Sequence, residues 1–441
     1  MPFRSGSIAY ARFRVVSTGS ITPPADASQD ILDALARHAL KPGDIGEPSP
    51  VEFGWCGGRH VFDEEFAPDH NVFGRSLLFA LRIDTNKVPA DIRRAYRAMS
   101  ETMFLADTPT GFLSRRERAA AREDAEERCR QELASGKYRR SKMVEILWDL
   151  KRGVLLAPVF AEANVAGLRD LFFSTFDLRL EPATAGSLAF DILSTQGRSR
   201  DYEDLLPSRF TSPPAGYSDG DRAESTGASS ESSRPQVPWS HSASEASDFL
   251  GNEFLLWLWR AGDAEGGELD LAGKRGPNSV ACILDRSLDM ECAWDVTGKL
   301  SLHNGVMTRA PEALRALQIG KWPRKAGLAI ASAGEGWQAA LLADRWQFSG
   351  LRLEPPKENP RLIRELIEHR LDSLSRFDSV MLALFESFLD ARAGGGWTAE
   401  RRRMSDWIGG RKAAPHRAPL LEPKLERAEE FAESASEDAC A

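Results

Sequence analysis

The chain has 441 residues, enough for two or three domains that each bury a core of their own. Its composition, 42% hydrophobic and 28% charged, is that of a globular protein. The formal net charge of −8 argues against a wholly basic nucleic-acid coat protein. It leaves room for a local basic surface, because a charged ligand responds to the field within about 8–10 Å.

The cysteines and the apolar runs of the sequence indicate the cellular compartment of the protein. Five cysteines are scattered without a C-x-x-C pair: Cys56, Cys129, Cys282, Cys292 and Cys440. This pattern favours reduced thiols in a cytosol over a disulfide framework or a zinc ribbon. The first residues lack a hydrophobic signal core, and no apolar run approaches the roughly 18 residues that span a membrane. We therefore expect a soluble, cytoplasmic protein with no membrane partner.

An N-terminal α+β domain is predicted for residues 1–195. Strand patterns occupy residues 7–16, 51–62 and 76–84. A helix follows Ser28, which can act as its N-cap, and another begins near Pro89 and extends to about residue 103. These elements precede the part of the chain in which the sequence patterns for helices, turns and strands are most closely spaced.

That part runs from Ser114 to Ala183. Ser114 and Glu117 have the spacing of a capping box, so a mostly charged helix begins there and ends near Gly136. A basic turn, residues 137–142, follows. Strands at 143–150 and 154–160, a helix at 162–174 and a strand ending at 182 then form a β-β-α-β unit. A unit of this kind can pack as two layers.

The rest of the chain divides by composition. Residues 196–247 are rich in Ser, Gly and Pro, which predicts a disordered linker. A second α+β domain is expected over residues 248–357, and its first helix places Trp257 and Trp259 in the core. C-terminal helices are predicted at 358–410 and a flexible tail at 411–441. The long amphipathic helix, about 360–392, favours packing within the chain over self-association.

The strongest functional signal is a basic cluster beside one tyrosine. Its members are Lys137, Tyr138, Arg139, Arg140 and Lys142, with Lys151 and Arg152 at the next turn. Cations on a turn can reach several phosphates and release condensed counterions, and a tyrosine can stack on an unpaired base. From the residues alone, a solvated turn that binds nothing explains the cluster equally well. A smaller cluster, Lys321, Arg324 and Lys325 around Trp322, is better explained as an ordinary basic loop.

Evidence for catalysis is weak. Asp63, Glu64 and Glu65 lie between His60 and His70, and two-metal nucleases use carboxylates with an occasional histidine. Consecutive acids alternate between the faces of a strand, however, so a solvated acidic loop is favoured. The chain lacks the G-x-x-x-x-G-K-[ST] and G-x-S-x-G motifs. We predict no catalytic residue, no metal site and no cofactor.

Three features, in order along the chain, resemble the RdgC family, the recombination-associated proteins of bacteria. The first is Phe53-Gly54-Trp55, after the N-terminal strand and helix. The second is the charged helix with the turn from Lys137 to Ser141 and the ILWD/GVLLAP hairpin. The third is the run from Glu253 to Trp259, followed later by Ile319-Gly320-Lys321. The resemblance covers residues 1–195 and 248–355 discontinuously.

The resemblance implies a DNA-binding protein with little sequence preference. Members of that family form a ring-shaped homodimer whose positively charged hole encircles duplex DNA, and they are linked to recombination and replication. Double-stranded DNA is the partner implied, with single-stranded DNA as an alternative, and the implied location is the nucleoid. This chain departs from the family in its linker, in its extension beyond residue 358, and at Asn304-Gly305-Val306, where members often have Lys-Lys-Gln.

Two other functions stay open. One is a metal-dependent DNA exonuclease that uses Asp63 or Glu64, since the RdgC family has also carried an exonuclease label. The other is an interaction scaffold that kept the fold but lost DNA binding, which the acidic balance of the chain makes reasonable.

Overall fold

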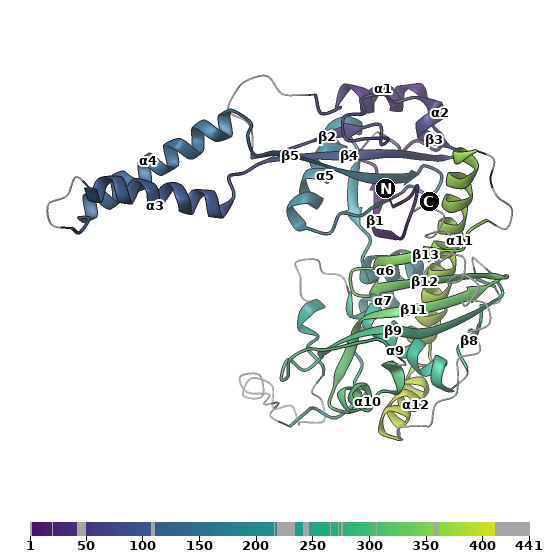
Figure 1. Cartoon of the computed structure of the whole chain (residues 1–441). Coiled ribbons are helices and arrows are strands. Elements are labelled where there is room, and N and C mark those ends of the chain that lie inside the picture. The colour runs from purple at the N-terminus through teal and green to yellow at the C-terminus, as the bar shows by residue number, and fades with distance from the viewer. Residues whose placement is uncertain are drawn as a thin grey trace, which may run out of the picture. The chain divides into compact units, whose positions relative to one another are not determined.

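A computed structural model describes residues 2–19, 21–41, 50–106, 111–215, 217, 234–240, 247–264, 266–271, 273–274, 277–305, 307–356, 360 and 362–410. The chain forms two compact units. We call Phe13–Glu181 the N-terminal unit, and Met1–Arg12 with Pro182–Ala441 the C-terminal unit. Helices and antiparallel strands are mixed in both, so the α+β class is confirmed (Figure 1). The unit boundaries differ from the predicted domain, 1–195, at both ends.

The N-terminal unit is built on an antiparallel sheet with the order β6 (Val154–Ala157), β5 (Arg139–Asp149), β4 (Ser76–Asn86) and β2 (Val51–Cys56). β4 and β5 pair over their whole length without a register shift, from Ser76 opposite Asp149 to Asn86 opposite Arg139. β3 (Val72–Phe73) also pairs with β4. The long β4–β5 ladder therefore fixes the positions of the helices and turns that are connected to its ends.

Helix α5 (Glu162–Phe176) packs on this sheet through aromatic side chains. The Trp148 ring lies 5.1 Å from the rings of both Phe172 and Phe176. Gly167 lies directly against Phe53, since a Cβ at Gly167 would lie 2.4 Å from that ring. The predicted β-β-α-β order is present, with α5 between β6 and β7 (Arg179–Pro182). Two short helices, α1 (Gln29–Arg37) and α2 (Pro68–Asn71), belong to the same unit.

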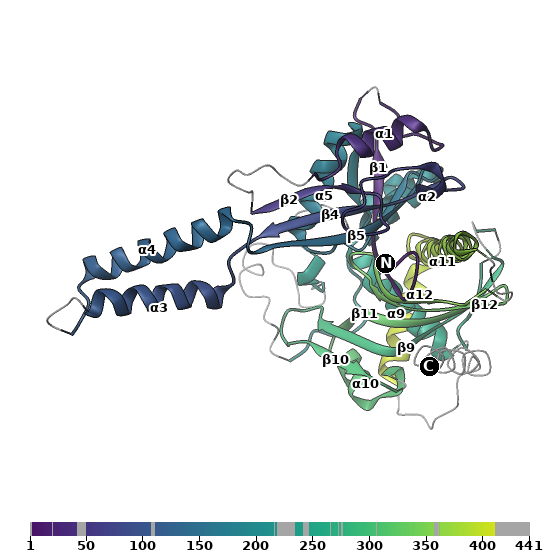
Figure 2. The same ribbon diagram turned by 45° about the horizontal axis from the view of Figure 1, so that its top comes forward.

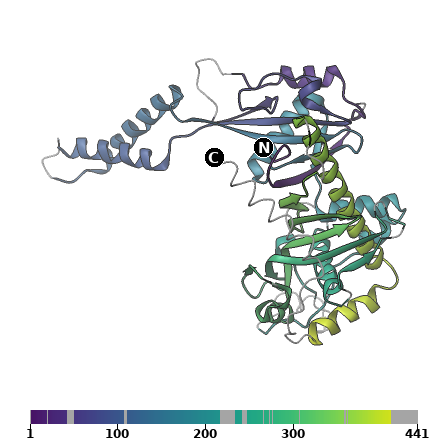
Figure 3. The same ribbon diagram turned by 45° about the vertical axis from the view of Figure 1, so that its right-hand side comes forward.

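A helical hairpin connects β4 to β5. It consists of α3 (Ala90–Ala106) and α4 (Arg115–Ala134), and it projects beyond the end of the β4–β5 ladder (Figures 1, 2 and 3). The predicted capping box of Ser114 and Glu117 is present at the start of α4. Ala121, Ala125 and Cys129 recur every four residues and are buried, which gives α4 a narrow seam of small residues. The hydroxyl of Ser100 on α3 donates to Asp124, 2.6 Å away.

The C-terminal unit has its own antiparallel sheet. The order is β10 (Leu300–His303), β9 (Ser279–Cys292), β11 (Lys321–Ser332), β12 (Glu335–Leu342) and β13 (Gln347–Leu353). β8 (Glu268–Asp270) pairs with β9, and β13 pairs with the start of β1 (Ile8–Val16). Tyr10 lies opposite Phe348, and their rings are 5.2 Å apart.

Long helices bury the apolar side chains of this unit. They are α9 (Phe249–Ala264) and α11 (Ile363–Arg392), accompanied by α6 (Ala185–Thr195), α7 (Ser199–Glu203), α10 (Pro311–Gln318) and α12 (Trp397–Gly410). The Phe385 ring on α11 lies 4.7 Å from Trp346 and 5.3 Å from Phe254 on α9. Trp257 and Trp259 are buried, as predicted. The apolar face of α11 therefore packs inside its own unit.

Part of the predicted linker is ordered. The apolar side chains of Leu205, Phe210 and Val237 are buried in the C-terminal unit. The backbone amide of Ser208 donates to Glu253 at 2.7 Å. Composition predicted disorder because apolar residues are sparse there, but these three side chains pack on the unit. Residues 218–233 and 241–246 of the predicted linker, and the predicted tail at 411–441, lie outside the described residues.

A buried ion pair fixes the ordered part of this segment. Arg392 donates from Nε to Glu253 at 2.5 Å, and from a terminal nitrogen to the carbonyl of Leu206 at 2.7 Å. Both charged side chains are almost fully buried, 6% and 0% exposed. Removing only the cation would leave an uncompensated carboxylate in the core.

Arg392→Met is therefore expected to lower the free energy of unfolding by roughly 3–5 kcal/mol. The double variant Glu253→Gln/Arg392→Met should recover much of the loss, because the stranded charge is gone. Urea unfolding followed by circular dichroism measures both. Equal stability of Arg392→Met and the parent would contradict the role of Arg392 as the buried counter-ion of Glu253.

Candidate nucleic-acid interface

The predicted basic turn is largely a strand. β5 begins at Arg139, and its first residues pair with β4, Arg140 opposite Thr85 and Lys142 opposite Ile83. Side chains alternate along a strand, so Arg140 and Lys142 point to one face while Arg139 and Ser141 point to the other. The prediction placed this strand start at residue 143 because four polar residues precede the apolar run. The ladder with β4 extends through them.

Arg139 belongs to an ion network of the fold. It contacts Asp84 at 3.0 Å and Glu52 at 3.1 Å, and Arg82 holds the same Asp84 with two hydrogen bonds, 2.9 and 2.7 Å long. Asp84 is 2% exposed. Its burial raises the pKa, but hydrogen bonds from Arg82, Ser141 and Arg139 outweigh burial and hold the pKa of Asp84 below its usual value. Arg139 is thus committed to holding the end of the sheet together.

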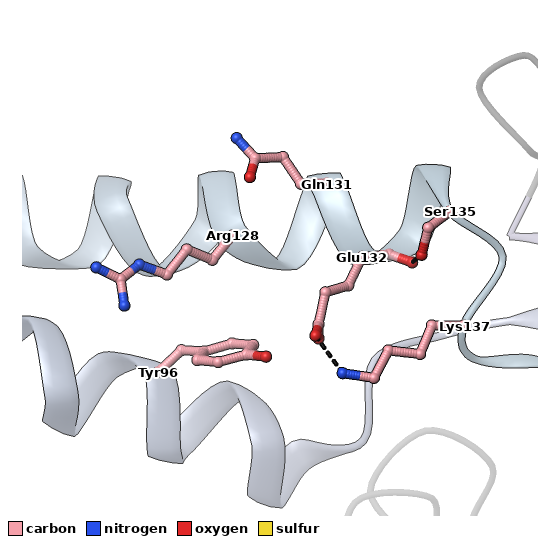
Figure 4. A pocket seen from close by; sticks show the side chains of 6 residues that line it. All are labelled: Tyr96, Arg128, Gln131, Glu132, Ser135 and Lys137. Carbon is pink, nitrogen blue, oxygen red and sulfur yellow. Dashed lines mark hydrogen bonds and ion pairs between the residues drawn. The ribbon is translucent and has the colours of Figure 1, made fainter.

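Lys137 and Tyr138 converge on an acid of α4. Figure 4 shows the amine of Lys137 directed at the carboxylate of Glu132. The hydroxyl of Tyr138 donates to the other oxygen of Glu132 at 2.5 Å, and Tyr96 of α3 bonds to the same carboxylate. Hydrogen bonds from Lys137, Tyr138 and Tyr96 lower the pKa of Glu132 to about 2. The charge of Lys137 is therefore offset within the protein.

Arg140 and Lys142 remain available. Both side chains are exposed, and neither has an ion-pair partner in the described part of the chain. Lys87, one residue beyond β4 at the same end of the sheet, has the same properties. We call Lys87, Arg140 and Lys142 the edge cations. The sequence prediction missed Lys87 because a single lysine after a strand carries no motif.

Lys151 and Arg152 lie at the opposite end of β5. The strand spans eleven residues, so its two ends are roughly 30 Å apart. The backbone amide of Arg152 donates to Asp149 at 3.0 Å, which closes the turn into β6. The prediction grouped these cations with the cluster at residues 137–142. The structure separates them, because a turn close in sequence is distant along an extended strand.

The smaller predicted cluster lies on β11 of the C-terminal unit, which is a strand and not a loop. Lys321 is buried and donates to the carbonyl of Gly298. Arg324 contacts Glu291 at 3.0 Å and Asp344 at 3.4 Å, while Lys325 is half-buried. Trp322 is buried in the core. Two of the three cations are therefore used by the fold.

The first turns of α4 carry a basic surface that the sequence prediction did not single out. Four arginines there are exposed, and none has an ion-pair partner among the residues that the structure describes: Arg115, Arg116, Arg118 and Arg122. We call them the hairpin arginines. The amide dipoles at the start of a helix add to their positive field. The run RRERAAAR is a sequence signal for this surface, since it holds four arginines and one acid, but its pattern alone predicts only a charged helix.

The acidic stretch considered for a nuclease is engaged internally. Asp63 is 2% exposed and accepts from the guanidinium of Arg59 at 2.7 and 3.0 Å. Its burial raises the pKa, but the hydrogen bonds from Arg59 and the backbone prevail and lower the pKa of Asp63. Over the described ranges, no group of three or more His, Cys, Asp or Glu side chains is arranged to hold a metal ion.

Comparisons with known proteins add no further identification. No protein-family model matches the chain, and no curated protein matches it either. Among the helices that the structure describes, none combines the length and the apolar character needed to cross a membrane.

Arg139 and Arg140 are adjacent cations with different roles, which stability measurements separate. Arg139→Gln is expected to cost about 1–2 kcal/mol of unfolding free energy, because buried Asp84 loses a charged donor. Arg140→Gln should leave stability unchanged, since its side chain is exposed. Urea unfolding of the two variants compares them directly. Equal losses would contradict the division of roles.

Proposed function

We propose that this chain is an RdgC-like protein that binds DNA through the phosphate backbone without sequence preference. The observation that carries the proposal is the set of exposed cations on the N-terminal unit for which the described residues offer no ion-pair partner. The edge cations lie at the end of the β4–β5 ladder, and the hairpin arginines lie on the helical hairpin that extends from this end. The order of motifs along the chain, which resembles the RdgC family, points the same way.

The chemistry of these groups suits phosphates. Arg and Lys in a solvent-exposed setting contact phosphate oxygens and release counterions, whatever the base sequence. Arg140 and Lys142 point to the same face of β5, about 7 Å apart along the strand, so one backbone segment is able to contact both. Rigid strand pairing holds them in place before DNA arrives, which lowers the entropy cost of binding.

The resemblance to the RdgC family extends the proposal to the oligomeric state and to the cellular process in which the protein acts. A homodimer that encircles duplex DNA would bring two copies of these cations to one duplex. Action in recombination and replication at the nucleoid would follow. The formal charge of −8 favours localised contacts over coating of DNA, since a net negative charge repels phosphate.

A second candidate is the interaction scaffold that kept the fold and lost DNA binding. The observation in its favour is internal neutralisation, since Lys137, Arg139 and Arg324 all pair with acids. The nuclease alternative has less support, because Asp63 is engaged by Arg59. Incubation of labelled linear DNA with Mg²⁺, with an Asp63→Asn variant as control, tests for that activity.

The edge cations provide the direct test of DNA binding. Arg140→Gln/Lys142→Gln is expected to weaken binding about equally for duplexes of unrelated sequence. It should also reduce the slope of log affinity against log salt by about 2, because two phosphate contacts are lost. Fluorescence anisotropy over about 50–200 mM salt measures both quantities.

The matched control is Arg364→Gln/Arg376→Gln on α11. The side chains of these arginines are 41% and 47% exposed, but each pairs with an acid, Glu368 or Glu335. The control makes the same change in net charge and should bind like the parent. If Arg140→Gln/Lys142→Gln also binds like the parent, Arg140 and Lys142 do not contact DNA.

A further inference from the structure

The carboxylate of Glu132 lies in a surface pocket otherwise lined by polar and cationic side chains. The pocket has a volume of about 410 Å³, and its other lining residues are Tyr96, Arg128, Gln131, Ser135 and Lys137. Figure 4 shows Glu132 between the ring of Tyr96 and the extended side chain of Lys137. Of the residues that the structure describes, Glu132 is therefore the one carboxylate that lines this pocket, with Tyr96 and Lys137 on either side of it.

The donors of this pocket also suit an anionic ligand. Lys137 and the hydroxyls of Tyr96 and Tyr138 all bond to Glu132, which satisfies an acceptor that ordinarily binds water. The hydrogen bond to Glu132 raises the pKa of Tyr138 to about 12, and it also raises the pKa of Lys137. Since even the ordinary pKa values of Tyr and Lys lie well above neutral pH, both side chains keep their protons and remain donors. Phosphate oxygens accept from the same groups.

The ion pair of Lys137 with Glu132 is more exposed to solvent than the ion pair of Arg139 with Asp84. Asp84 is 2% exposed, so its pairing with Arg139 is part of the folded core. The side chains of Glu132 and Lys137 are 21% and 56% exposed, so solvent and solutes reach them. Exposed ion pairs are weak and are screened by salt. The Lys137–Glu132 pair is therefore able to exchange partners without unfolding the sheet.

We propose that Glu132 is an internal competitor of DNA phosphate for Lys137 and Tyr138. In the free protein it holds both side chains against α4, and it lowers the positive charge beside the edge cations by one. This inference rests on the proposed function, because it assumes that DNA reaches the end of the β4–β5 ladder. The arrangement keeps non-specific affinity below what the cations of this surface would otherwise give.

Substitution of the competitor is expected to strengthen binding. Glu132→Gln keeps the shape of the side chain and acceptor oxygen for the tyrosines but releases Lys137. The variant should bind duplex DNA roughly threefold to tenfold more tightly, and its salt slope should steepen by about 0.9, the value for one added phosphate contact. Fluorescence anisotropy against duplex DNA at several salt concentrations measures both.

The matched control is Glu126→Gln on the same helix. Glu126 is exposed and has no ion-pair partner among the described residues, so its removal changes the net charge equally but releases no cation. The control should keep the salt slope of the parent. If Glu132→Gln and Glu126→Gln behave alike, the competitor role is overturned, while salt-dependent binding by the parent still supports the proposed function.

A double-mutant cycle gives an independent test. Lys137→Gln alone should leave the salt slope unchanged, because Lys137 is occupied by Glu132 and makes no phosphate contact. In the Glu132→Gln background the same change should abolish the gain in affinity. A salt slope lowered by about 0.9 on Lys137→Gln alone would overturn the inference, since Lys137 would then already contact a phosphate. Absence of DNA binding by the parent would overturn the proposed function and this inference together.

Discussion

The uninterrupted pairing of β4 with β5 is the constraint on which the rest of the N-terminal unit depends. Eleven residues of each strand pair in register, from the aromatic core near Trp148 to the polar end at Arg139. The apolar half of the ladder is stabilised by α5. The polar half is held by the ion network of Arg82, Asp84 and Arg139. Without that network, four polar residues would have little reason to remain in a strand.

The same network decides which cations are available to a ligand. Alternation along β5 directs Arg139 to the buried acids and directs Arg140 and Lys142 to the other face. The helical hairpin begins and ends at this end of the ladder, so its own cations and the acid Glu132 are held in fixed relation to the strand. Structural and accessible charges therefore alternate within a few residues, and net charge alone gives a poor account of this surface.

The sequence predicted local structure better than it predicted long-range pairing. The capping box of α4, the hairpin turn at residues 151–153 and the burial of Trp257 and Trp259 follow from short patterns, and all are present. The pairing of β1 with β13 joins residues far apart in the chain, which no local pattern reveals. This pairing is one reason why Met1–Arg12 belongs to the C-terminal unit.

The candidate site was predicted in part. Arg140 and Lys142 are exposed as expected, but Arg139 is engaged because its acids, Glu52 and Asp84, come from two other strands. Composition likewise placed residues 205–210 in a disordered linker, although Ser208 and Phe210 are anchored in the C-terminal unit. In each case the residue contacts a partner that is distant in the sequence. Local sequence patterns do not reveal such a partner.

The most direct test of backbone-mediated DNA binding is the salt dependence of affinity for the unmodified chain. Titration of duplexes of unrelated sequence from about 50 to 200 mM salt gives the number of phosphates contacted. This account predicts similar affinities for the different sequences and a steep, linear fall of log affinity with log salt. Absence of binding, or binding that does not weaken as salt rises, would contradict it.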